Sequence, residues 1–146
     1  MERQTLAVGV ADLLNFARAV DAVGSDGEVD LLQAAYQAAG DVILQHGGQI
    51  RKYLGDAILF TFTDPRQAIS AAHEIVAGYR FAVGSLTLRY RVAIVTGEVL
   101  VGQIGHPSYL VEDILGITVN RVFRLLPEAS RSASGVALCD ETWKYI

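Results

Sequence analysis

Short apolar runs constrain the fold of this chain more than any other feature. Leu6–Asp12 (LAVGVAD) is a nearly unbroken run that ends in a carboxylate, a pattern typical of a buried strand. Gln49–Tyr53 and Ala57–Thr63 (AILFTFT) are two β-rich runs separated only by residues 54–56. Their spacing predicts a β-hairpin.

Stretches with helical spacing lie between these runs. Leu13–Val23 has helical character, and apolar residues then recur at helical intervals over residues 29–43 until the glycine pair at 47–48. Pro65 stands at the first position of another predicted helix, which continues to about Arg80. The N-terminal half therefore alternates strands and helices.

The second half contains a further hairpin and a short helix. Leu86–Thr96 and Val99–Ile104 flank the pair Gly97-Glu98, which predicts a turn at that pair. Apolar residues over 119–126 fall on one helical face, and Pro127 is expected to end this helix. A last strand is predicted near Val136–Cys139.

The order of these elements predicts an α+β fold with a ferredoxin-like, split βαβ sheet and helices packed on one face. The 146 residues suffice for one core, so we expect residues 1–146 to form a single domain. Hydrophobic residues make up 51% of the chain and charged residues 19%, which is ordinary globular composition.

Charge and cysteine content exclude several classes of function. A net charge of −4 provides no broad positive field for nucleic acid, so we expect no nucleic-acid partner. No apolar run approaches the roughly 20 residues of a membrane span, and no signal-peptide pattern follows the N-terminus, so a cytoplasmic protein is expected. The single cysteine, Cys139, excludes an intrachain disulfide or a cysteine-based zinc site.

Two aspartates stand where predicted strands end. Asp12 ends the first strand and Asp56 lies in the hairpin turn, so a sheet with these strands side by side would bring both carboxylates to one edge. Such a pair suits Mg²⁺, which takes one or two carboxylates together with substrate phosphates. Taken singly, each residue is equally typical of an ordinary turn or a helix cap.

Further polar residues accompany these carboxylates. Asn120 and Arg124 are four apart on the short helix and project from one side, an arrangement that suits a phosphoryl oxygen. A solvated helix face has the same pattern. Asp113 interrupts an apolar stretch, where a buried acid needs a partner, and Lys52 is a complementary donor.

Four segments that include these residues resemble one known family, the class III nucleotidyl cyclase catalytic domain. The resemblance runs nearly without gaps from about Leu6 to Trp143, and it includes polar positions as well as apolar spacing. The segments are Val8–Ala17 (VGVADLLNFA), His46–Phe62 (HGGQIRKYLGDAILFTF), Val95–Gly105 (VTGEVLVGQIG) and Asp113–Leu125 (DILGITVNRVFRL).

The resemblance implies a role for each polar residue. Asp12 and Asp56 would bind two Mg²⁺ or Mn²⁺ ions, and Asn120 and Arg124 would orient the ribose and stabilise the reacting phosphorus. The reaction would be attack of the ribose 3′-hydroxyl on the α-phosphate of ATP, giving 3′,5′-cyclic AMP and pyrophosphate. The site would form between two protomers of a homodimer.

In this resemblance Lys52 and Asp113 would recognise the base. Adenine offers an acceptor ring nitrogen and a donor amino group, which an ammonium and a carboxylate match. Guanine presents the reverse pattern, and each buried polar group left unpaired costs about 1–3 kcal/mol. ATP is therefore expected to be favoured over GTP.

The chain also departs from the family pattern. Asn15 and Ala17 stand where the first metal loop, D-I-x-G-F-T, usually has glycine and threonine, and Val122 and Phe123 replace small residues between the helix Asn and Arg. These changes keep open an alternative, a cyclase-like domain that dimerises or binds nucleotide without turnover.

Overall fold

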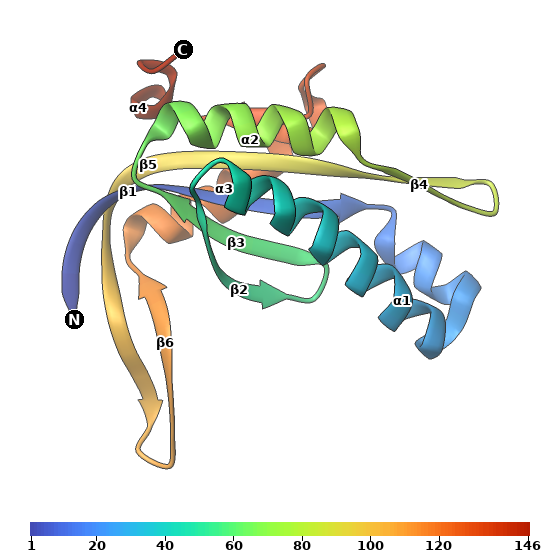
Figure 1. Cartoon of the computed structure of the whole chain (residues 1–146), viewed down its shortest axis with the longest axis horizontal. Helices are drawn as coiled ribbons and strands as arrows, with labels where there is room; N and C mark the ends of the chain where they lie inside the picture. The colour runs from blue at the N-terminus through green and yellow to red at the C-terminus, as the bar shows by residue number, and fades with distance from the viewer.

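The computed structural model describes all residues, 1–146, as one seven-stranded sheet with four helices (Figure 1). The strands follow the order β2-β3-β1-β5-β4, and β6 and β7 also pair with β5. The elements are β1 (Glu2–Leu14), α1 (Phe16–Gln45), β2 (Gln49–Leu54), β3 (Ala57–Phe62), α2 (Pro65–Gly78), β4 (Arg80–Val83), β5 (Leu86–His106), β6 (Tyr109–Leu115), α3 (Ile117–Arg131), β7 (Val136–Leu138) and α4 (Asp140–Trp143).

The pairing confirms the predicted α+β class and its split βαβ units. β3 is antiparallel to both β1 and β2, so β1-α1-β2 is a parallel unit with β3 inserted between its strands. In the same way β3 and β5 are parallel to each other, with β1 between them. The chain passes from β3 to β5 through α2 and then β4. The hairpin predicted over residues 49–63 is also confirmed, with its second strand ending at Phe62, as is the helix that begins at Pro65.

Helices cover both faces of the sheet, and the prediction that they pack on one face is wrong. Alternate residues of β1 point to opposite sides. Ala7 and Ala11 lie in a core with α1 and α2, while Val8 and Val10 lie in a second core with α3. Figure 1 shows α1 in front of the strands, α2 alongside β5, and α3 behind the strands. The unbroken apolar run of β1 is needed because both of its faces are buried.

β5 is one long strand, and the turn predicted at Gly97-Glu98 does not exist. Both residues pair with β1, Gly97 opposite Leu6 and Glu98 opposite Thr5. A side chain at Gly97 would place Cβ 2.6 Å from Oγ1 of Thr118 on α3. Glycine is required here because the helix approaches the strand closely, a cause that local sequence does not reveal.

The outer parts of β5 and β6 form an arm that extends away from the body of the molecule (Figure 1). Its tip carries exposed apolar side chains, with Tyr109 at 75% and Leu110 at 52% exposure. Ile104 and Val111 pair across the same hairpin and are also exposed. Apolar side chains gathered on one projecting element are typical of a contact surface.

Two helices differ in detail from the expectation. α1 joins the two predicted helical stretches across Gly24, whose φ of 75° and ψ of −177° interrupt helical geometry. α3 continues through Pro127 to Arg131 although the proline was expected to end it. Pro127 lacks the N–H that a helix residue donates, and Leu126 and Ala129 on either side are buried in the core that holds the helix in place.

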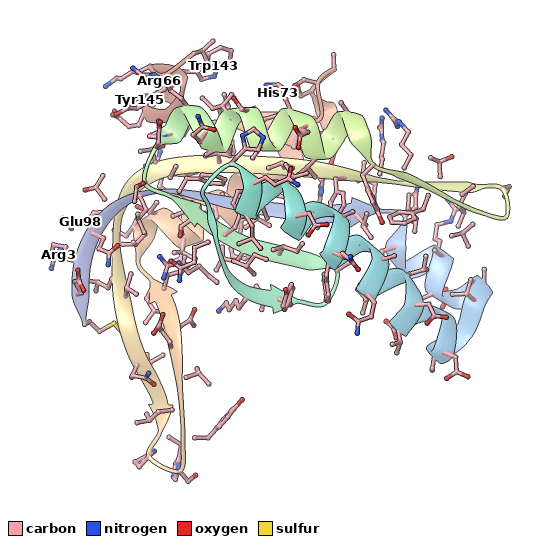
Figure 2. The ribbon with its side chains drawn as sticks, viewed as in Figure 1. Arg3, Arg66, His73, Glu98, Trp143 and Tyr145 are labelled. Atoms are coloured by element: carbon pink, nitrogen blue, oxygen red, sulfur yellow. The ribbon has the colours of Figure 1, made fainter.

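The C-terminal turn packs beside the start of α2. The guanidinium of Arg66 lies 5.9 Å from the centre of the Tyr145 ring, and Figure 2 shows both next to Trp143. Near the N-terminal end of β1, Arg3 forms an ion pair with Glu98 of β5 (Figure 2). None of the helices combines the length and hydropathy that crossing a membrane would require.

Gly9→Ala is expected to lower the free energy of unfolding by about 1–3 kcal/mol. A Cβ at Gly9, in the middle of β1, would lie 2.2 Å from Cζ of Phe60, which is fully buried. Chemical denaturation measures the change. Gly78→Ala is the matched control, because a Cβ there meets no atom within 4 Å. An equal loss in both variants would contradict the packing explanation.

Candidate functional site

Asp12 lies near the end of β1 on the face that α3 covers. It continues the alternation of Val8 and Val10, and its register partner on β5 is Arg91. The guanidinium donates to both carboxylate oxygens, from Nε to Oδ1 at 2.7 Å and from Nη2 to Oδ2 at 3.2 Å. Arg91 is not among the residues predicted from sequence, because only the register of β1 and β5 places it opposite Asp12.

Asp56 reaches the same place from the turn between β2 and β3. Leu54 pairs with Ala57, so Gly55 and Asp56 form a two-residue hairpin loop, and Gly55 has the positive φ, 59°, that such loops require. The Oδ2 atom of Asp56 accepts a hydrogen bond from the backbone N–H of Leu13 at 3.2 Å. The structure thus brings Asp56 beside the end of β1.

The two carboxylates influence each other electrostatically. Partial burial raises the pKa of Asp56, and the negative charge of Asp12 raises that pKa further. Arg91 and the hydrogen bond from Leu13 act in the opposite direction but do not cancel the effect. A pair of carboxylates under such mutual repulsion has excess negative charge that a cation would relieve.

These oxygens fit Mg²⁺ or Mn²⁺ in ligand type. Both ions prefer carboxylate oxygen and leave several coordination positions to water or phosphate. No group of three or more His, Cys, Asp or Glu residues lies together in the chain, so no third side chain of these types joins Asp12 and Asp56. Water or substrate phosphates would supply the further ligands of ions held by these two carboxylates.

A cavity of about 340 Å³ adjoins the carboxylates and is lined by residues 13–18 together with Asp56 and Arg91. Asn15 lies in this loop with φ 69° and ψ 13°. It is the only residue other than glycine with positive φ in the chain. Asparagine tolerates this conformation better than most residues, so Asn15 can occupy the left-handed position in this loop.

Lys52 and Asp113 form a second group. The ammonium Nζ lies 3.0 Å from Oδ2 of Asp113, and Oδ1 of Asp113 accepts the N–H of Ile114 at 2.8 Å. A shift in register between Ile50 and Lys52 places Lys52 opposite Leu59, whose side chain lies in the core on the α3 face. The irregularity therefore turns Lys52 toward the face that carries Asp12.

Asn120 and Arg124 form the third group, on α3. Both are exposed, and neither makes a side-chain hydrogen bond or ion pair within the chain. Val122 is fully buried, as expected for the apolar face over residues 119–126, but Phe123 points outward with 36% exposure. Arg124 borders an open cavity of about 450 Å³.

The predicted site residues thus fall into three groups within one chain. Asp12 and Asp56 lie together, and Lys52 lies with Asp113. No hydrogen bond or ion pair joins either pair to Asn120 or Arg124. Within one chain, the predicted site residues therefore do not form a single connected cluster.

Comparison with known proteins shows what this chain resembles. The guanylyl cyclase Cya2 superposes with a TM-score of 0.83 at 25% identity, over 99% of this chain and 79% of that one. The adenylate cyclase of Streptomyces coelicolor is 29% identical over 133 residues, which cover 91% of this chain and 32% of that protein. The chain has the fold of nucleotide cyclase catalytic domains, and it resembles class III cyclases in sequence.

The similarity covers only part of the length of the relatives found by sequence. An uncharacterised protein of Mycobacterium tuberculosis is 30% identical over 128 residues, which cover 86% of this chain. The chain spans about a third of the length of the mycobacterial and Streptomyces relatives, 31% and 32%. No protein-family model matches the sequence. Adenylyl and guanylyl cyclases both occur among the similar structures, so the fold alone does not select a base.

Asp56→Asn is expected to raise the melting temperature at pH 7 by about 1–2 °C. The raised pKa means that the folded state holds the Asp56 proton more tightly than the unfolded state. The free energy of unfolding therefore falls as pH rises from the unfolded pKa, about 3.9, through the folded pKa, and the loss persists at neutral pH.

Thermal melts between pH 3 and pH 8 measure this dependence, which the asparagine variant should show less strongly. Asp41→Asn, an exposed acid on α1, is the control and should leave the dependence unchanged. A lower melting temperature of Asp56→Asn at pH 7 would contradict the assigned repulsion.

Proposed function

We propose that this chain is an adenylate cyclase domain that converts ATP to 3′,5′-cyclic AMP and pyrophosphate at the interface of a homodimer. The observation that carries the proposal is the meeting of Asp12 and Asp56 at the end of β1. Their shared negative charge lies beside a loop-lined cavity, in a chain that has the fold of the nucleotide cyclases. The chemistry follows from what each of the three groups can do.

Asp12 and Asp56 would hold two divalent cations, Mg²⁺ or Mn²⁺. Such ions supply Lewis acidity and charge neutralisation for phosphoryl transfer. The guanidinium of Arg91 now neutralises Asp12, so it must share or release that carboxylate when a cation binds. Arg91 would then be free to donate to an anionic substrate from the same position.

Lys52 and Asp113 would recognise adenine. In the structure they satisfy each other at 3.0 Å, with side-chain exposures of 35% and 14%. Separated by an adenine edge, the ammonium would donate to a ring nitrogen and the carboxylate would accept from the amino group. Guanine would present a ring N–H to the lysine, which has no acceptor.

Asn120 and Arg124 would act on the phosphate and ribose of a nucleotide held by the partner protomer. Arg124 would donate to the α-phosphoryl oxygens, whose negative charge increases as the ribose 3′-oxygen attacks the phosphorus and the bond to pyrophosphate breaks. Asn120 would orient the ribose by hydrogen bonding. Both side chains are exposed and unpaired, so their partners would come from outside the chain.

A second copy of the chain would complete the site. The β5–β6 arm supports this inference, because its exposed apolar tip gives each protomer a surface to bury. In a two-fold symmetric dimer each site would take Asp12 and Asp56 from one protomer and the other two groups from its partner.

The alternative is a domain that binds nucleotide without turnover. Two observations favour it. Phe123 points outward between Asn120 and Arg124, and Arg91 forms an ion pair with Asp12. In that case ATP binds and dimers form, but no cyclic product appears. Product formation therefore separates the two functions.

Purified protein with ATP and Mn²⁺ is expected to produce cyclic AMP and pyrophosphate, and GTP is expected to be a poorer substrate. Asp56→Ala should lower kcat by about 10²-fold or more, since it removes one of two cation ligands. Chromatographic quantification of both products measures the rate, and Asp41→Ala is the control. Saturable ATP binding with no product would support the alternative.

Mixing two inactive variants tests the shared site. Asp56→Ala and Arg124→Ala should each be inactive alone. After mixing and exchange, about half of the dimers are mixed and each of these has one intact site, so about a quarter of the wild-type activity should return. Failure of mixed dimers to regain activity, with exchange verified by differently tagged copies, would contradict the two-protomer site.

A further inference from the structure

We infer that a second pocket, next to the carboxylate pair, binds a small phosphate-class anion. The pocket has a volume of about 290 Å³ and lies between α2, the paired strands β4 and β5, and the loop that follows α3. Three arginines line it, Arg80, Arg89 and Arg91, together with His73 of α2, which is labelled in Figure 2. No aspartate or glutamate lines it.

Arg80 and Arg89 are placed where their charges repel each other. They are direct register partners in the antiparallel pairing of β4 with β5, so their side chains lie on the same face of the sheet. Like charges directly opposite each other destabilise a sheet. Neither residue has an acidic partner, since no ion pair of the chain includes them. An anion between them would turn this repulsion into attraction.

Arg91 connects the pocket to the carboxylate pair. It is two residues from Arg89 on β5 and therefore on the same face. Its Nε and Nη2 atoms donate to Asp12, whereas Nη1 donates to the hydroxyl of Ser130 at 2.7 Å. Ser130 also lines the pocket, so the third nitrogen of the guanidinium faces this side.

The loop after α3 adds hydroxyl groups. Ser132 and Ser134 line the pocket, and their hydroxyl oxygens lie 2.9 Å apart. Hydroxyl donors beside planar guanidinium groups are suited to the several oxygens of a phosphate. The volume is at the lower end of the range for small-molecule sites, which favours orthophosphate or pyrophosphate over a whole nucleotide.

The pocket differs from the cavity beside Asp56. That cavity is lined by residues 13–18, Asp56 and Arg91, and neither Arg80 nor Arg89 contributes to it. Only Leu14 and Arg91 line both. Anion binding at this pocket requires neither cations nor the proposed cyclase activity, so it can be measured without them.

Calorimetric titration with inorganic pyrophosphate and, separately, with orthophosphate tests the inference. The titrations use the full chain with EDTA, at an ionic strength held constant with KCl. Saturable 1:1 binding is expected, and Arg80→Gln combined with Arg89→Gln should weaken it at least tenfold. Tighter binding of pyrophosphate would indicate a diphosphate ligand, and tighter binding of orthophosphate would indicate a monophosphate.

Two control variants locate the site. Arg131→Gln lies beyond the pocket on α3, and Arg18→Gln removes a charge from the cavity beside Asp56, so both should bind as the wild type does. Arg80 and Arg89 are exposed, and the melting temperature of the double variant without anion should equal or exceed that of the wild type. Absence of saturable binding, or equal weakening by Arg18→Gln, would overturn the inference.

Discussion

The antiparallel pairing of β1 with β5 is the constraint on which the rest of the structure depends. It extends over the whole of β1, from Glu2 opposite Val101 to Leu14 opposite Arg89. Because β1 is buried on both faces, its register determines which side chains meet α1 and α2 and which meet α3. A shift by one residue would turn Asp12 to the opposite face.

The same pairing sets the electrostatics of the α3 face. Asp12 and Asp56 concentrate negative charge at the end of β1, and Arg80, Arg89 and Arg91 concentrate positive charge on adjacent strands. Only Arg91 belongs to both regions. Charges of opposite sign, held close by a rigid sheet, can bind a cation and an anion side by side, and nucleotide chemistry uses both kinds of ligand.

Polar and apolar side chains without partners in the chain are a second property of the molecule. Asn120 and Arg124 have no partners within the chain, and the arm formed by β5 and β6 leaves apolar side chains such as Tyr109 exposed. These features are costly for an isolated protomer and are resolved if a second copy supplies the missing contacts. The proposed dimer would satisfy both the candidate site and the exposed arm.

Local sequence determined the hairpin around Gly55, the helix that begins at Pro65 and the identity of the polar residues, because turn geometry and apolar periodicity act over a few residues. Tertiary structure decided that Gly97 lies inside a strand, that α3 covers the second face, and that Arg91 meets Asp12. These features arise from register and close packing between segments far apart in the chain, and neither leaves a periodic signal in the sequence.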